Sequence, residues 1–209
     1  MPDVGRAARL RVQRQLAVAR HGVDMLERKQ RIIAAEHERL LLGADHLQQA
    51  WERAARDAAV WADRAAALDG WPAIEAAAPS GAATMRAEAG HVMGVEFTDA
   101  GEATVPERLP SGGSSALELA AEAMAEAVRA AAAYAAARRA STTVEAELVA
   151  TRTRRRAVEH RWIPRLEGEL ARIEGALEEL EREENLRVRW ALDARRPRRT
   201  AGSRTGGAG

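Results

Sequence analysis

The chain has 209 residues and a formal net charge of +1, which bounds it to one domain or two. Only 3% of the residues are aromatic and much of the 46% hydrophobic fraction is alanine, so a compact globular core of ordinary size is excluded. Alanine, glutamate, arginine and leucine dominate instead, as in long helices and coiled coils. The sequence contains no cysteine, which excludes disulfides and thiolate chemistry and fits a reducing compartment.

A heptad pattern predicts one long N-terminal helix. Apolar residues spaced alternately three and four apart begin at Val12 and continue to Leu68, with Gln30 and His37 as the polar exceptions. The Gly-Trp-Pro sequence that follows Asp69 predicts the end of this helix.

Residues 71–114 predict a small central module. Residues 75–89 are rich in alanine and interrupted by proline and glycine, which favours short helical turns or loop. Residues 91–97 are rich in β-prone types, and Thr104-Val105 follows a short polar stretch. We therefore expect a small hairpin here.

A second long helix is predicted from Ser115, which forms a capping box with Glu118, to about Asp193. Its apolar seam slips by one residue at Pro164, where a helix should bend because proline removes a backbone donor and clashes with the preceding turn. Before the slip the seam is Val144, Leu148, Thr151, Arg155, Val158 and Trp162. After it the seam is Ile163, Leu166, Leu170, Ile173, Leu177 and Leu180.

Opposite charge blocks predict that the two helices pair with each other. Residues 6–31 are mainly basic and residues 167–184 mainly acidic, so an antiparallel hairpin brings the blocks together. A parallel self-dimer would set like charges side by side. The expected rod holds both termini at one end, and its register places His37 near residues 162–164.

The predicted fold is therefore all-α, a long antiparallel two-helix coiled coil with a small central hairpin and short-helix module. The expected segments are the N-terminal helix (1–70), the central module (71–114), the C-terminal helix bent near Pro164 (115–193) and a disordered basic tail (194–209).

Catalytic and metal-binding motifs are missing from the sequence. The five histidines lack metal-ligand spacing, and the glutamates are typical of a solvated coiled-coil face, so no enzyme, cofactor or metal site is expected. The most apolar run, residues 120–137, is mostly alanine and carries charges, so no membrane insertion is expected. Arginines at 152–156 and 195–199 raise nucleic acid binding as an alternative, but no aromatic residues interleave with them, and we favour a solvated face and a solubilising tail.

Both ends of the chain resemble one family. Residues 10–29, with a Leu-x5-Leu, Ala-Arg, Gly and Asp-x-Leu-x-x-Lys pattern, look like the opening helix of the D subunit of the V/A-type rotary ATPases. Residues 153–167 and 180–187 resemble the closing helix of that protein, and Ile-Pro-Arg-Leu-Glu at 163–167 is the most specific signal, since few families keep proline inside a helix. Met-Gly-Val at 93–95 resembles the family's central hairpin.

The resemblance implies a non-catalytic central rotor shaft that transmits torque between a nucleotide-hydrolysing head and a membrane ring carrying protons or sodium ions. It implies these partners: the catalytic and non-catalytic head subunits, the small F subunit of the stalk and the subunit that docks the shaft on the ring. It also implies a cytoplasmic place, peripheral to the membrane. Our hypothesis is that arginines at the predicted tip meet acidic loops of the head, namely Arg6, Arg9, Arg11, Arg14, Arg187 and Arg189. The alternative is another coiled-coil scaffold, such as an export-apparatus stalk.

Overall fold

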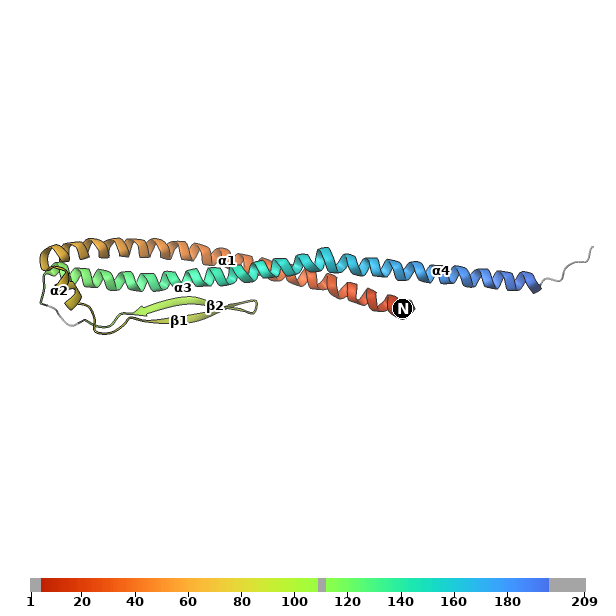
Figure 1. The fold of residues 1–209 in the computed structure, drawn as a ribbon, viewed down its shortest axis with the longest axis horizontal. Coiled ribbons are helices and arrows are strands. Elements are labelled where there is room, and N and C mark those ends of the chain that lie inside the picture. The colour runs from red at the N-terminus through yellow and green to blue at the C-terminus, as the bar shows by residue number, and fades with distance from the viewer. Residues whose placement is uncertain (1–4, 109–111, 196–209) are drawn as a thin grey trace, which may run out of the picture. The chain divides into compact units, whose positions relative to one another are not determined.

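The structure is a computed structural model that describes residues 5–108 and 112–195. Its elements, drawn in Figure 1, are α1 (Arg6–Asp69), α2 (Trp71–Ala76), β1 (Thr84–Val92), β2 (Val95–Thr104), α3 (Ser115–Ala157), the π-helix η1 (Val158–Trp162) and α4 (Ile163–Arg195). The predicted fold class is confirmed, because two long helical stretches flank a central hairpin. The predicted tail lies outside the described residues from position 196 onward.

The chain forms two compact units, and each is described by itself. Unit 1 takes its residues from Met1–Val23 and Ala157–Gly209, and unit 2 consists of Asp24–Arg156. Within the described ranges, no helix is both long and apolar enough to cross a membrane.

In unit 1 the first turns of α1 pack antiparallel against η1 and α4. Both helices bury one apolar stripe in a shared core, as the heptads predict. The buried members are Ala8, Val12, Leu16, Ala19, Leu166 and Ile173, with Val158, Ile163, Leu170 and Leu177 packed around them.

The slip in the heptads is a single π-helical turn. The amide of Ile163 donates to the carbonyl of Val158, five residues back, so the turn holds one residue more than an α-helical turn. Val158 and Ile163 therefore both face the core, and Pro164 follows directly. The expectations that Trp162 and Leu180 belong to the seam are wrong, because these residues are 46% and 49% exposed. The Arg165 guanidinium lies 5.8 Å from the ring centroid of Trp162.

In unit 2 the rest of α1 pairs with α3, and alanine supplies much of the contact. Small side chains let two helix backbones approach closely. One cluster holds Ile33, Leu40, Phe97, Ala140, Val144 and Leu148. Another, near α2, holds Ala65, Ala77, Ala116, Leu117 and Ala120.

The predicted register of His37 is wrong. This residue lies between Ile33 and Leu40 on α1, and those two residues pack with Ala140 and Val144 of α3. The apolar pattern repeats every seven residues and so permits several registers, while the actual one depends on which layers fit together.

The hairpin is longer than predicted and its turn lies elsewhere. β1 and β2 are antiparallel, and Val92 pairs with Val95 across a two-residue loop. Met93 and Gly94 have φ of 48° and 80°, the left-handed pair that a type I′ turn requires. The expectation of turns or loop over residues 84–89 is wrong, because these residues form most of β1.

The hairpin is held against the helices by β2. The ring of Phe97 is buried in unit 2, and Gly101 lies so close to α3 that a Cβ atom there would stand 2.6 Å from the Cβ of Ala136. A register shift leaves Asp99 unpaired in the ladder, and its carboxylate lies 3.4 Å from the Arg39 guanidinium on α1. Figure 1 shows the two strands beside α3.

The N-cap of the second helical stretch is Ser114, one residue before the predicted Ser115. Ser114 is the residue whose hydroxyl accepts the amide of Leu117, at 3.4 Å, so the predicted cap at Ser115 is displaced by one position. The amide and hydroxyl of Ser114 both donate to the carboxylate of Asp69, which ties the end of α1 to the start of α3. Glu118 instead pairs with Arg108.

Candidate partner-binding surfaces

Ion pairs join the basic start of α1 to the acidic part of α4, as the charge blocks predict. Their order fixes the two segments as antiparallel within unit 1. The pairs are Arg6–Glu181 (3.9 Å), Arg9–Glu174 (2.9 Å) and Arg20–Glu167 (2.9 Å). All six side chains are substantially exposed, so each pair contributes at most about 1 kcal/mol and serves mainly to select orientation.

The predicted arginines of α1 have different surroundings. Arg6 and Arg9 face acidic side chains of α4 and line a groove of about 510 Å³ with them. Arg11 and Arg14 lie further along the helix and are exposed. Arg9 therefore has a structural partner in its own chain, while Arg14 presents its charge to solvent.

The predicted arginines of α4 lie beyond the paired region. Arg187 lies 3.4 Å from Glu183 on its own helix, and Arg189 is exposed. The three ion pairs place Arg14 opposite residues 169–173, so Arg14 and Arg187 are separated by about 21–27 Å along the helix axis. The six arginines are thus spread along unit 1 among the acidic side chains of α4 and do not form a single cluster.

The last turns of α4 carry large apolar side chains, which the sequence analysis did not single out. Leu186, Val188, Trp190 and Leu192 are 51%, 57%, 72% and 60% exposed. At 100° per residue, the first and third point to one side of the helix and the other two to the opposite side. Arg187 and Arg189 lie between these two apolar sides of the helix. The alternating Leu-Arg-Val-Arg-Trp-Ala-Leu sequence is the signal that identifies this surface.

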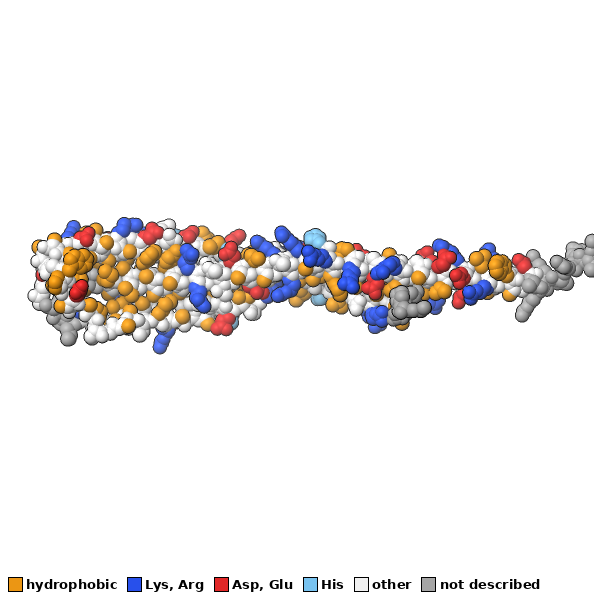
Figure 2. Space-filling view, in the orientation of Figure 1, with side chains coloured by type: hydrophobic (Ala, Val, Ile, Leu, Met, Phe, Trp, Pro, Cys, Tyr) orange, Lys and Arg blue, Asp and Glu red, His pale blue; other side chains and the backbone are white. Residues whose placement is uncertain are grey.

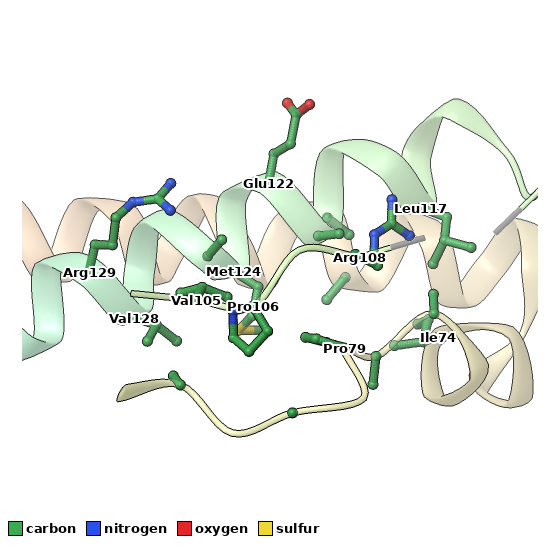
Figure 3. A pocket seen from close by; sticks show the side chains of 18 residues that line it. Ile74, Pro79, Val105, Pro106, Arg108, Leu117, Glu122, Met124, Val128 and Arg129 are labelled. Carbon is green, nitrogen blue, oxygen red and sulfur yellow. The ribbon is translucent and has the colours of Figure 1, made fainter. Parts of the chain in front are cut away.

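An apolar groove of about 560 Å³ lies in unit 2, where α2, the strand ends and α3 meet. Figure 3 shows its labelled apolar side chains, and Figure 2 shows hydrophobic side chains gathered over this part of the unit. The principal lining residues are Ile74, Pro106, Leu117, Met124 and Val128, with Arg108 and Arg129 also contributing.

A polar layer interrupts the helix pairing in unit 2. The ammonium of Lys29 donates to the Glu147 carboxylate at 2.8 Å, and the hydroxyl of the fully buried Thr151 lies 3.5 Å from the same oxygen. The hydrogen bond from Lys29 lowers the pKa of Glu147 below its usual range, against the opposing effect of burial.

The histidines and carboxylates of the described segments do not assemble into a metal site. Over the ranges that the structure describes, no three or more histidine, aspartate or glutamate side chains gather as metal ligands would. On the hairpin, the side chains of His91 and Glu96 lie 3.9 Å apart, and both are largely exposed.

Comparison with known proteins decides the family. One family model, described as the D subunit of ATP synthase, matches residues 8–193. The chain belongs to the family of ATP synthase D subunits. The matched region includes α1 from its first turn and α4 nearly to its end, so both arms of the antiparallel pairing belong to the match. As a member of this family, the chain is a stalk subunit of a rotary ATPase and part of a complex with other subunits. Among curated proteins, none matches the chain.

Proposed function

We propose that this chain is the non-catalytic central shaft of a V/A-type rotary ATPase, which transmits torque between a nucleotide-hydrolysing head and a membrane ring that carries protons or sodium ions. The family match across both arms of the antiparallel helix pair is the observation that carries the proposal. In this role the chain binds the catalytic and non-catalytic head subunits, the small F subunit of the stalk and the subunit that docks on the ring. Its place is cytoplasmic and peripheral to the membrane.

The helix pairing suits a shaft because torque transfer requires resistance to twisting and sliding. In unit 1 the apolar core and the cross-helix ion pairs oppose sliding of α1 along α4. In unit 2 the Lys29–Glu147 bond and the layer of Ile33 and Val144 do the same for α1 and α3. Polar pairs at fixed positions along a coiled coil allow only one register of the two helices. Because the helices cannot slide past each other, a rotation applied to one helix is transmitted to the other.

We place the head around the end of α4. Its exposed apolar side chains on two opposite sides, Leu186 with Trp190 and Val188 with Leu192, fit contact with more than one surrounding subunit, and the interleaved Arg187 and Arg189 fit acidic loops. Arg14 on α1 offers a further exposed basic side chain. Exposed ion pairs of this kind would let the shaft turn inside the head without binding it tightly, because each pair contributes little free energy in water.

The first test is purification of the chain with its partners. A shaft brings down two large nucleotide-binding subunits and a small partner of about 100 residues in fixed stoichiometry. Recovery of a different set of proteins, with no nucleotide-binding subunits, refutes the proposal and favours the coiled-coil scaffold.

The second test reverses charges in the purified complex. Arg14→Glu together with Arg189→Glu should leave ATP hydrolysis active but reduce the number of ions pumped per ATP. The reason is that the reversed charges weaken the contacts between the shaft and the acidic loops of the head. Arg53→Glu, an exposed position in unit 2, is the matched control. Unchanged coupling in the double variant contradicts the role of these arginines.

A further inference from the structure

The outer strand of the hairpin has an unpaired edge. The sheet has two strands, and β2 lies on one side of β1. Residues 84–89 of β1 are all exposed, whereas Phe97 and Gly101 of β2 are buried against the helices. Within the described residues the other edge of β1 therefore has no strand beside it.

The ladder register shows which backbone groups this edge offers. Val92 and Val95 close the two-residue loop as a hydrogen-bonded pair, so the amides and carbonyls of alternate residues bond to β2. Those of Met85, Ala87 and Ala89 point the other way. β1 contains no proline, no lysine and no extra residue, since the bulge lies in β2, so none of these usual devices blocks strand addition.

The charged residues of β1 favour antiparallel pairing between two copies of this strand. Arg86 and Glu88 are two residues apart on one face, and both are exposed. In an antiparallel pairing of two copies about a two-fold axis at Ala87, each Arg86 lies directly opposite the Glu88 of the other copy. The same register sets Met85 against Ala89. A pairing centred on Arg86 or on Glu88 instead opposes like charges, which is unfavourable.

We propose that β1 is a self-association edge, through which a second copy of this chain adds antiparallel to form a four-stranded sheet centred on Ala87. A two-stranded hairpin is marginally stable, and two further strands satisfy its free backbone groups. The strand covers only nine residues, so the dimer is weak and forms in concentrated samples of the free chain. The proposal concerns the unassembled chain and does not depend on the proposed function.

The charge pattern allows a test by mixing variants. Glu88→Arg alone and Arg86→Glu alone each place two like-charge pairs in a homodimer and should weaken association about tenfold, because the symmetry counts each substitution twice. Mixed in equal amounts, the two variants restore both opposite-charge pairs and should form a heterodimer at least as readily as the unchanged chain dimerises. Sedimentation of the full chain measures both effects. The control is Glu96→Arg on β2, which should leave dimerisation unchanged.

A cysteine test needs no change of charge. The chain has no native cysteine, so Ala87→Cys carries a single thiol that meets its symmetry mate and should form a disulfide-linked dimer on mild oxidation. Ala100→Cys, exposed on β2, should stay largely monomeric. Equal cross-linking at both positions, no preference for the mixed dimer, or cross-linking of position 87 solely to a different protein overturns the proposal.

Discussion

Two neighbouring isoleucines on α1 test the helix pairing of unit 2. Ile33 is fully buried in the cluster with Ala140 and Val144, while Ile32 is 42% exposed. Ile33→Ala removes three buried carbon atoms from a packed layer and should lower the free energy of unfolding by about 2–5 kcal/mol. Ile32→Ala should change it by less than about 0.5 kcal/mol, or raise it slightly, because alanine is the better helix former.

The assay is urea unfolding followed by circular dichroism at the helical band, with the midpoint and slope fitted for both variants. The two substitutions delete the same atoms, so composition and chain length cancel in the comparison. Equal destabilisation by the two variants, or a larger effect from Ile32→Ala, refutes the assignment of the buried face and with it the pairing of α1 with α3.

Three further outcomes are expected. The hydrogen bond from Lys29 lowers the pKa of Glu147, so the ionised carboxylate stabilises the fold at pH above the ordinary glutamate pKa of about 4.3. This stabilisation is lost as the pH falls through the lowered pKa of Glu147. In Lys29→Met, unfolding measured against pH should show a smaller loss of stability in acid. Gly101→Val should lift the hairpin from α3 and speed its cleavage by trypsin, whereas Ala100→Val, at an exposed position, should not. Trp162→Ala should cost less than about 1 kcal/mol in thermal unfolding, because the ring is half exposed; a cost of about 3 kcal/mol or more, as for a core tryptophan, contradicts the π-turn.

The hairpin shows where sequence reasoning fails. Residues 84–89 belong to the alanine-rich stretch 75–89, which favours helix or loop, yet they form a strand because β2 provides the ladder partners. The turn is also unusual, since Met93 occupies a left-handed position that normally selects asparagine or glycine. Local preference was overruled by pairing in both cases.

The charge pairing within unit 1 was predicted from the sequence, while contact of the arginines with a partner stays a prediction. The charge blocks anticipated the antiparallel pairs of Arg9 and Arg20 with α4, because complementary blocks are readable without coordinates. The six predicted arginines do not form one cluster, since their spacing depends on the helix register. The apolar end of α4 was missed, because its residues alternate and so match no helical stripe.

The amino-acid sequence alone determined the two long helical stretches, most of the faces they bury, their antiparallel orientation and the family resemblance. These properties depend on local periodicity and on the order of charges, both of which are linear in the chain. The tertiary structure decided the helix register, the extra residue at the π-turn, and the position where the hairpin packs on α3 through Gly101. A heptad repeat is nearly degenerate under shifts of seven residues, and only the fit of particular side chains between two surfaces selects one of them.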